Sequence, residues 1–596
     1  MMLKKTKIVA SISDLRCDVD FIRDLFNAGM NVVRMNTAHA SREGFEQLIA
    51  NVREVSNRIG ILMDTKGPEV RTTKNAEDTT EYKTGDQVKI IGNPEKETVR
   101  GCIYVTYPNF VNDLSVGAKI LIDDGDLELK VTDKDEEALY CEVCNDATLA
   151  SRKSVNVPGV RINLPSLTEK DRNNILYAIE KDIDFIAHSF VLDIREILNA
   201  YGSDIKIIAK IENQEGVDNI DEILEVADGI MVARGDLGIE VPQERIPGIQ
   251  RILIKKCILA KKPVIVATQM LHTMINNPRP TRAEVTDIAN AIYYRTDALM
   301  LSGETAYGKY PVEAVRTMAT IAAQAEKDKL EENDIQIPLT PEKTDVPSFL
   351  AKSAVRASNL MPIRAIITDS FSGLTARSLA AYRGKYPVLA VCYKEKTMRH
   401  LALSYGVEAI FMPEKANGQA YYFAALQKLL DDGVLSENEI DEESEYLKAL
   451  YRDTHVKLLR PRMASGHLQG RLLKMLVRMI RPRRILEIGT YSGYSALCMA
   501  EGLEPDGRLY TFEINDEQED FTRPWIENSP YASQIEFIIG DALKRVPEME
   551  LTFDMAFVDG DKRRYTDYYE MILPRLEPGG YILADNTLWD GHVLEP

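Results

Sequence analysis

Ionisable and hydroxyl-bearing residues follow one short apolar run after another between residues 34 and 304. The set comprises Arg34, Asn36, Asp64, Lys66, Glu69, Arg71, Ser189, Lys210, Glu212, Arg234, Asp236, Thr268, Ser302 and Glu304. Residues with purely structural roles would be scattered over both ends of the runs. If the runs are parallel strands of a closed sheet, their carboxyl ends meet and these groups form one polar site.

The mixture of charges in this set favours phosphoryl transfer. Glu212 and Asp236 suit one Mg²⁺ that keeps several waters in its shell. Lys210, Arg34 and Arg71 are cations that can hold a phosphoryl group, and this reaction needs mainly positioning and charge neutralisation. A Schiff-base role is the alternative for Lys210. Because Glu212 lies two residues further on and would keep the lysine protonated, we favour the role of a cation.

Repeated strand–helix units must position these residues. The predicted strands are 7–12, 31–35, 59–63, 184–190, 205–211, 229–233, 263–268 and 297–301, and most are separated by segments with helical spacing. Eight such units predict a closed (β/α)₈ TIM barrel. The predicted catalytic barrel comprises residues 1–71 and 169–340.

Three further segments differ from this pattern. Residues 72–168 are rich in Val, Thr, Gly and Asp and predict an inserted β-barrel lid domain. Residues 341–435 predict a smaller α/β domain. An acidic stretch at 431–446 marks a boundary, and residues 436–596 predict a further, Rossmann-like α/β domain that begins near R-I-L-E-I-G-T-Y-S-G-Y-S.

Composition excludes several classes of partner. The 596 residues are 45% hydrophobic and 28% charged, with a net charge of -19. Such a balance disfavours nucleic acid or an anionic membrane as the main partner, and no apolar run is long enough to span a bilayer. Seven cysteines without framework spacing suit a reducing cytosol, so we expect a cytoplasmic protein. Cys141 and Cys144 are expected to be structural because no second pair follows them.

Motifs over residues 4–415 resemble the pyruvate kinase family. They include V-V-R-M-N, M-D-T-K-G-P-E-V-R-T, A-K-I-E-N-Q-E-G-V, D-G-I-M-V-A-R-G-D-L-G-I-E, P-V-I-V-A-T-Q-M-L and M-L-S-G-E-T-A-Y-G, in family order. The resemblance implies transfer of a phosphoryl group from phosphoenolpyruvate to ADP, which gives pyruvate and ATP. It also implies a homo-oligomer, usually a tetramer.

The same resemblance implies a role for each matching residue. Lys210 would stabilise the phosphoryl group in flight, and Glu212 and Asp236 would bind Mg²⁺. The amides of Gly235 and Asp236, with Thr268, would hold the substrate carboxylate. Enolate protonation would involve Thr268, with a water relay through Ser302 and Glu304. The residues implied to face the nucleotide phosphates of ADP or ATP are Arg71, Arg34, Asn36, His39 and Lys153.

A potassium site is implied at Asn36, Asp64 and the carbonyl of Thr65. Glu69 matches the K⁺-dependent members of the family. The chain departs from the usual N-F-S-H by reading N-T-A-H, so that Ala38 lacks a hydroxyl expected on K⁺. We therefore expect weaker or water-filled K⁺ binding.

Two loop features have two interpretations each. Lys153 lies near the return hinge of the predicted lid, which would exclude water on closing, but it could equally be a solvated loop lysine. The segment 368–377, T-D-S-F-S-G-L-T-A-R, matches a region that binds sugar-phosphate effectors in some family members. A helix cap explains it almost as well.

The C-terminal segment resembles cation-dependent O-methyltransferases of the catechol and caffeoyl-CoA type. The resemblance implies Mg²⁺ on Asp559, Asp585 and Asn586, with Lys562 as the base for a catechol-like hydroxyl. The residues implied to contact S-adenosylmethionine are Glu487, Gly489, Glu513 and Asp541. The family has about two more strands beyond G-H-V-L-E-P, so we expect cofactor-site residues to be present and methyl transfer to be in question.

Three functional hypotheses follow. The chain is a pyruvate kinase with a methyltransferase-like appendage, a methyltransferase on an inactive kinase scaffold, or a non-enzymatic fusion product. Intact Lys210, Glu212, Asp236 and Thr268 favour the first, and pyruvate formation distinguishes all three.

Overall fold

A computed structural model describes residues 4–38, 41–160, 162–328, 346–360, 363, 365–413, 418–431, 433, 436 and 443–586. The chain divides into two compact units. The first consists of Met1–Lys352 and Ala365–Leu426, and the second of Ser353–Arg364 and Gln427–Pro596.

Eight parallel strands close a barrel in the first unit, in the order β1-β17-β16-β15-β14-β13-β3-β2. Their bounds are β1 (Lys7–Ser11), β2 (Val32–Asn36), β3 (Gly60–Asp64), β13 (Phe185–His188), β14 (Lys206–Ile211), β15 (Gly229–Ala233), β16 (Val264–Ala267) and β17 (Ala298–Leu301). Every residue of β1, β3, β13, β15, β16 and β17 is buried, as expected for parallel strands covered on both faces. The predicted TIM barrel is confirmed.

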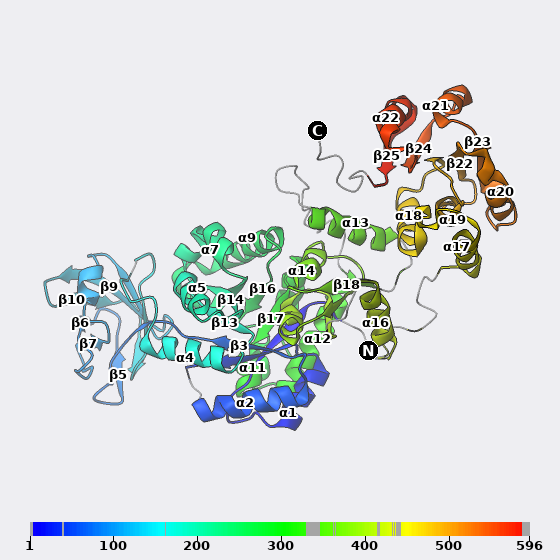
Figure 1. Cartoon of the computed structure of the whole chain (residues 1–596). Coiled ribbons are helices and arrows are strands. Elements are labelled where there is room, and N and C mark those ends of the chain that lie inside the picture. Colours follow the sequence, from blue (N-terminus) through cyan, green and yellow to red (C-terminus); the bar gives the residue numbers. More distant parts are fainter. Residues whose placement is uncertain are drawn as a thin grey trace. The chain divides into compact units, whose positions relative to one another are not determined.

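Helices cover the outside of the barrel, and Figure 1 shows α5, α7 and α9 around β13, β14 and β16. The principal helices are α1 (Val19–Ala28), α2 (Arg42–Val55), α4 (Glu169–Glu180), α5 (Val191–Ala200), α7 (Ile220–Val226), α9 (Ile246–Leu259), α10 (Arg282–Tyr293) and α12 (Pro311–Asp328). Capping boxes begin α4 at Thr168 and α10 at Thr281. A large apolar cluster joins the helices to the strands, and a smaller one fills the barrel interior.

The insertion between β3 and α4 is built mainly from strands. Its seven-stranded sheet has the order β4-β12-β8-β9-β10-β6-β7, and β11 pairs with β5 separately. The bounds are β4 (Val70–Arg71), β5 (Thr79–Tyr82), β6 (Gln87–Gly92), β7 (Cys102–Val105), β8 (Lys119–Ile122), β9 (Leu127–Lys134), β10 (Leu139–Val143), β11 (Ala147–Ala150) and β12 (Ser154–Asn156). The insertion has an apolar core of its own.

A three-stranded parallel sheet follows the barrel, in the order β18-β19-β20. Its strands are β18 (Ile366–Ser370), β19 (Val388–Cys392) and β20 (Val407–Phe411), accompanied by α14 (Leu374–Ala381) and α15 (Glu395–His400). Arg399 on α15 donates to the buried Asp184, which directly precedes β13, at 2.6 Å. Lys396 of the same helix bonds Asp182 at 2.7 Å. These ion pairs tie the small sheet to the amino-terminal end of the barrel strands.

The second unit contains a five-stranded parallel sheet in the order β23-β22-β21-β24-β25. Its strands are β21 (Arg484–Ile488), β22 (Arg508–Glu513), β23 (Ile535–Ile539), β24 (Phe553–Val558) and β25 (Leu576–Ala584). The order reverses on either side of β21, and ligands of such sheets bind beyond the carboxyl ends of the strands at this point. The principal helices are α17 (Glu445–Lys457), α18 (Gly466–Ile480), α19 (Tyr494–Ala500), α20 (Glu519–Glu527) and α22 (Tyr565–Ile572).

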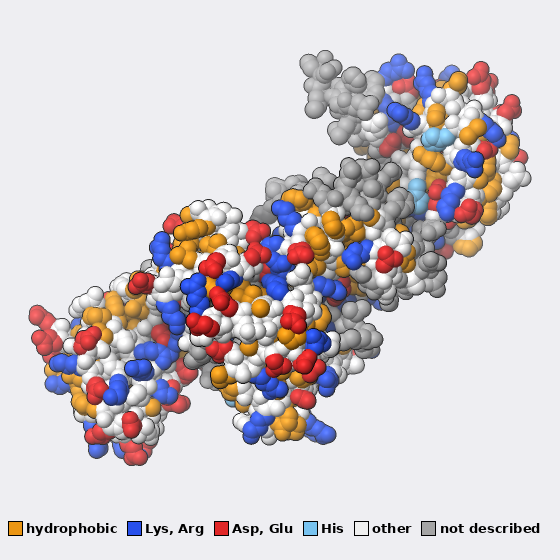
Figure 2. All heavy atoms as spheres, turned by 60° about the horizontal axis from the view of Figure 1, so that its bottom comes forward, with side chains coloured by type: hydrophobic (Ala, Val, Ile, Leu, Met, Phe, Trp, Pro, Cys, Tyr) orange, Lys and Arg blue, Asp and Glu red, His pale blue; other side chains and the backbone are white. Residues whose placement is uncertain are grey.

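The surface carries charges of both signs, and Figure 2 shows acidic and basic side chains interspersed on the face in view. Among the described residues, no helix is both long enough and apolar enough to cross a bilayer.

Candidate active sites

Lys210 lies at the centre of the polar site at the barrel mouth. It is the penultimate residue of β14, and its Nζ lies 2.6 Å from Glu212 and 3.4 Å from Asp64 at the end of β3. Ser189, which follows β13, donates to the other oxygen of Glu212 at 2.6 Å. Three neighbouring strands therefore bring together a lysine, two carboxylates and a hydroxyl, as the strand–helix pattern predicts.

The charges of this cluster depend on one another. Burial lowers the pKa of Lys210, but Asp64 and Glu212 outweigh burial and raise the pKa above its ordinary value, so this lysine is a cation. Burial raises the pKa of Asp64, yet Lys210 and Arg34 together hold it below its ordinary value. For Asp236, burial and then the charge of Glu212 raise the pKa to about 6. Asp236 thus lies in a site with more negative charge than its neighbours neutralise.

Arg34 and Asn36, both on β2, point toward different partners. Arg34 donates to Asp64 at 2.6 and 2.7 Å and to Ser11 at 2.9 Å. The side-chain oxygen of Asn36 accepts the amide of Ala38 at 3.0 Å. Thr65 is buried and bonds the carbonyl of Ala187 through its amide and its hydroxyl. His39 lies outside the described residues.

The loop after β3 forms an ion-paired cluster. Glu69 contacts Lys66 at 2.5 Å and also pairs with Arg71. A guanidinium nitrogen of Arg71 donates to the carbonyl of Arg152 at 2.6 Å, which connects this loop to the insertion. Lys153 forms its ion pair with Asp123, another residue of the insertion, at 2.7 Å.

Thr268, which follows β16, adopts a left-handed backbone with φ of 68°. Such a conformation is costly for a β-branched residue and indicates a position that the surrounding structure imposes. The amide of Gly235 donates to the Thr268 hydroxyl at 2.8 Å, and Arg234 donates to its carbonyl at 2.6 Å. The loops after β15 and β16 are therefore joined around this threonine.

Glu304 is buried, and its carboxylate accepts hydrogen bonds from the backbone amides of two loops. One carboxylate oxygen accepts the amide of Ser302 at 2.8 Å, and the other accepts the amide of Leu271 at 3.1 Å. The sequence predicts Glu304 near Ser302 but gives no sign of the contact with Leu271. The carboxylate thereby holds the loops after β16 and β17 at a fixed separation.

A divalent metal ion at the barrel mouth would be coordinated by two carboxylates. Among the described residues, no group of three or more Asp, Glu, His or Cys side chains is arranged for one ion. Glu212 and Asp236 nevertheless suit Mg²⁺, since this ion keeps several waters and often takes one or two protein carboxylates together with substrate oxygens. Burial, and then the charge of Glu212, raises the pKa of Asp236, so a nearby cation would favour its ionised form.

In the second unit, β21 and β22 place two acidic side chains at the switch point. Glu487 is fully buried and accepts the hydroxyls of Ser495 and Thr511, each at 2.6 Å. Burial raises its pKa to about 8. Glu513 at the end of β22 accepts the amides of Tyr491 and Asn515 at 2.8 and 2.9 Å.

The residue that follows β21 is a glycine because another segment of backbone passes close to it. Gly489 has φ of +101°, and a Cβ there would lie 2.4 Å from the carbonyl oxygen of Asp559. Asp541, after β23, begins α21 (Ala542–Arg545) by accepting the amide of Leu543 at 3.1 Å, and Arg564 contacts its other oxygen at 3.3 Å.

A lysine-centred group lies beyond the ends of β24 and β25. Lys562 donates to Asp559 at 2.8 Å, to the hydroxyl of Tyr565 at 2.6 Å and to the carbonyl of Asp585 at 3.2 Å. Gln469 donates to the carboxylate of Asp585 at 3.1 Å. Asn586 is exposed and has φ of 48°. Burial, and to a lesser degree Asp585, raises the pKa of Asp559 to about 6 although Lys562 opposes the shift.

Comparisons with known proteins agree with this arrangement. Residues 3–315 match the family model of the pyruvate kinase barrel domain, and residues 349–440 match that of the pyruvate kinase alpha/beta domain. A pyruvate kinase from Borreliella burgdorferi is 48% identical over 447 residues, which cover 74% of this chain and 93% of the relative. The chain belongs to the pyruvate kinase family.

Further relatives of the pyruvate kinase family support the assignment. The enzyme from Geobacillus stearothermophilus is 50% identical over 425 residues, which cover 68% of this chain and 71% of the relative. The crystal structure of a pyruvate kinase from Cryptosporidium parvum aligns with a TM-score of 0.69 at 35% identity, over 73% of this chain and 92% of that one. Residues 436–596 match the O-methyltransferase family model, so the chain also carries an O-methyltransferase domain.

Several residues around these sites were not predicted. Ser11 anchors Arg34 in the pyruvate kinase barrel, and Tyr565 and Gln469 contact the Lys562 group in the second unit. Tyr565 follows Lys562 by three residues, a spacing that places both on one side of a helical turn. Gln469 lies 116 residues before Asp585, and no local pattern connects the two.

Proposed function

We propose that the barrel transfers a phosphoryl group from phosphoenolpyruvate to ADP, with Lys210 as the cation that holds the group in transit. The observation that supports this proposal most strongly is the position of Lys210, with carboxylates at 2.6 and 3.4 Å. These neighbours keep it charged and hold its long side chain at the mouth of the barrel. A fixed positive charge stabilises developing charge on a transferring group because it needs no reorganisation during the reaction.

Glu212 and Asp236 would hold the divalent cation. The ion would neutralise charge on the substrate oxygens. Ser189 supports Glu212 by donating a hydrogen bond to one oxygen, which leaves the carboxylate oriented while Lys210 contacts the other. Both acids must be ionised for this role.

The amides of Gly235 and Asp236 and the hydroxyl of Thr268 would bind the substrate carboxylate. In the structure the Gly235 amide donates to Thr268, so a bound carboxylate would take over this donor. Thr268 would then be free to direct its hydroxyl toward the enolate, and a water between Thr268 and Ser302 would complete the proton path. Glu304 would act by keeping the Ser302 loop in place.

The nucleotide phosphates would meet Arg71, Arg34, Asn36, His39 and Lys153, with K⁺ at Asn36, Asp64 and Thr65. Arg34 and Lys210 already neutralise Asp64, and Ala38 offers no hydroxyl. This arrangement supports only weak binding of a monovalent cation. A cytoplasmic homo-oligomer is proposed from the family.

The second unit is proposed to bind S-adenosylmethionine at Glu487, Gly489, Glu513 and Asp541. The observation favouring it is the switch point of the sheet, where two acidic side chains lie near a glycine turn with close backbone approach. Asp559, Asp585 and Asn586 would hold Mg²⁺. Lys562 would serve as base only after losing a proton, and its contacts with Asp559 and Tyr565 oppose that loss.

A coupled assay of pyruvate formation from phosphoenolpyruvate and ADP tests the first proposal. Saturable, ADP-dependent turnover supports it, and its absence with intact full-length chain rejects it. Transfer of a labelled methyl group from S-adenosylmethionine to catechol, with and without Mg²⁺, tests the second. Equilibrium binding of S-adenosylmethionine distinguishes a unit that binds this cofactor without transferring a methyl group from one that does not bind it.

A further inference from the structure

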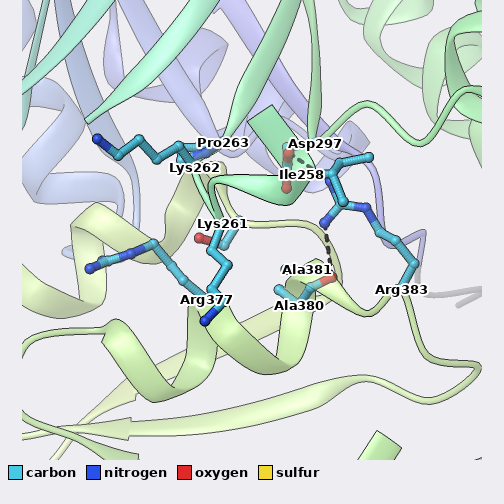
Figure 3. A pocket seen from close by; sticks show the side chains of 10 residues that line it. Ile258, Lys261, Lys262, Pro263, Asp297, Arg377, Ala380, Ala381 and Arg383 are labelled. Atoms are coloured by element: carbon cyan, nitrogen blue, oxygen red, sulfur yellow. Dashed lines mark hydrogen bonds and ion pairs between the residues drawn. The ribbon is translucent and has the colours of Figure 1, made fainter. Parts of the chain in front are cut away.

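Two parts of the first unit are attached to the barrel in different ways. Buried ion pairs fix the three-stranded part, and Figure 3 shows one of them, between Arg383 and Asp297 at 2.7 Å. In the described part of the chain, the ion pairs of residues 72–163 join residues of the insertion to one another, as Lys153 pairs with Asp123. Movement of the insertion relative to the barrel would therefore be accommodated mainly at its two connections.

Contacts on either side limit the outgoing connection to a few residues. Thr65 bonds the carbonyl of Ala187 on β13 through its amide and its hydroxyl, so it belongs to the barrel. Val70 belongs to the apolar core of the insertion. The outgoing hinge is therefore the turn of residues 66–69, in which Gly67 has φ of +73°.

The return connection is equally short. Leu164 packs against the core of the insertion, whereas Leu167 packs against the core that surrounds the barrel. Residues 165–166 therefore form the second hinge. Helix α4 begins directly after it, with a capping box between Thr168 and Asp171 that fixes its first turn.

The imidazole ring of His188 lies beside the outgoing hinge. His188 is the last residue of β13 and is fully buried. A Cβ placed on Gly67 would lie 3.6 Å from its Nε2. Burial lowers the pKa of His188, and Asp171 is the strongest of the charges that oppose this shift. The ring is therefore neutral and lies between the outgoing hinge and the first turn of α4.

One nitrogen of this ring has a hydrogen-bond partner and the other has none. Nδ1 of His188 accepts the amide of Phe190 at 2.8 Å. A neutral ring whose Nδ1 is an acceptor carries its proton on Nε2. Among the described residues, Nε2 has no hydrogen-bond partner, although buried donors are nearly always bonded and an unpaired one is costly. A buried N–H therefore faces the hinge turn without an acceptor in this arrangement of the loop.

We propose that His188 is a positioning residue for the lid, whose Nε2–H donates to a main-chain carbonyl oxygen of residues 66–68 when the insertion closes over the barrel mouth. Gly67 has no Cβ, so its backbone can change conformation and turn such a carbonyl toward the ring. The hydrogen bond exists in the closed arrangement and not in the one described above. It therefore increases the population of the closed lid.

Closure affects the reaction because the outgoing hinge leads directly to Arg71 on β4, which is proposed to face the nucleotide phosphates. This consequence rests on the proposed phosphoryl transfer. If Arg71 contacts ADP in the closed arrangement, a smaller closed population raises the KM for ADP. At saturating ADP the nucleotide itself drives closure, so kcat should change little.

Steady-state kinetics of full-length variants tests the kinetic consequence. We expect His188→Ala to raise the KM for ADP by roughly three- to tenfold, the equilibrium factor of one hydrogen bond, and to change kcat by less than about twofold. His188→Gln places an amide N–H near the position of Nε2 and should restore the KM. His188→Asn can accept the Phe190 amide but is too short to reach the turn, so it should not restore the KM. His455→Gln alters an exposed histidine of the second unit and should leave both constants unchanged.

Hydrogen exchange measures closure without catalysis, and circular dichroism confirms that each variant is folded. Adding Mg·ATP to the unmodified chain should slow amide exchange in peptides that span residues 65–72 and 164–170. This slowing should be smaller in His188→Ala and recovered in His188→Gln.

Two results would overturn the inference. The first is equal slowing of exchange in the unmodified chain and in folded His188→Ala, which is expected if a water molecule satisfies Nε2 in every position of the lid. The second is restoration of the KM by His188→Asn and not by His188→Gln, which would assign the effect to the bond with Phe190. Because exchange is measured without turnover, failure of this inference is distinguishable from failure of the proposed phosphoryl transfer.

Discussion

The ammonium group of Lys210 lies 2.6 Å from a carboxylate oxygen of Glu212, and both residues leave β14 at the mouth of the barrel. The same carboxylate accepts the hydroxyl of Ser189 through its other oxygen. Glu212 is therefore positioned from two sides, by a cation on its own strand and by a hydroxyl from the neighbouring strand.

Replacement of Glu212 is expected to weaken metal binding. Glu212→Gln should raise the Mg²⁺ concentration for half-maximal pyruvate formation by at least about tenfold, because one of two charged ligands is lost. Ser189→Ala, which removes only an orienting hydrogen bond, is the matched control and should give a smaller rise. An unchanged Mg²⁺ requirement in Glu212→Gln would show that the ion binds elsewhere.

We expect pyruvate formation by this chain to respond only weakly to K⁺, and the response to be stronger after one substitution. Ala38→Ser places a hydroxyl two residues after Asn36, so the K⁺ concentration for half-maximal activity should fall. Steady-state kinetics at varied KCl, with ionic strength held constant by tetramethylammonium chloride, measures the effect. Equal K⁺ dependence in the two proteins would argue against a cation at Asn36 and Asp64.

Gly489 is expected to tolerate no side chain, whereas Gly579 should tolerate one at moderate cost. Both have positive φ, but a Cβ at position 489 would meet the carbonyl of Asp559 at 2.4 Å, while position 579 is open. Gly579→Ala should lower the free energy of unfolding of the second unit by about 1–2 kcal/mol, and Gly489→Ala by clearly more. Both tryptophans of the chain, Trp525 and Trp589, lie beyond residue 443, so urea titration followed by tryptophan fluorescence reports on this unit. Equal losses would show that the backbone relaxes around position 489.

Glu487 is expected to make the second unit less stable as pH rises. In the unfolded chain this carboxyl ionises near its ordinary pKa of 4.5, whereas in the folded unit it keeps its proton up to about 8. Between these values the folded state binds more protons, so its stability falls by up to about 1.4 kcal/mol per pH unit. Tryptophan-monitored unfolding from pH 5 to 8 should show this slope, and Glu487→Gln should lack it. A slope that survives the substitution would assign the effect to another group.

Much of the fold and part of the site followed from sequence alone. The eight apolar runs correspond to the eight barrel strands because parallel strands buried on both faces consist of continuous apolar residues. The grouping of Lys210 with Glu212 and Asp64 follows from the rule that the carboxyl ends of barrel strands meet at one mouth, although β13 separates β14 from β3 in the barrel.

Contacts between distant loops could not be predicted in this way. Glu304 bonds the amide of Leu271, and Lys153 pairs with Asp123, because of side-chain directions set by tertiary packing. Sequence patterns predict at which end of the barrel a residue lies. Tertiary packing determines which other residues its side chain contacts.

The role of Lys210 is tested by comparing pyruvate formation by the unmodified chain and by Lys210→Met, at saturating phosphoenolpyruvate, ADP, Mg²⁺ and K⁺. We expect turnover in the unmodified chain and its abolition in the variant, with the thermal unfolding profile retained, because methionine fills similar space without charge. Substantial pyruvate formation by a folded Lys210→Met protein would contradict the assignment of Lys210 as the cation that carries the phosphoryl group.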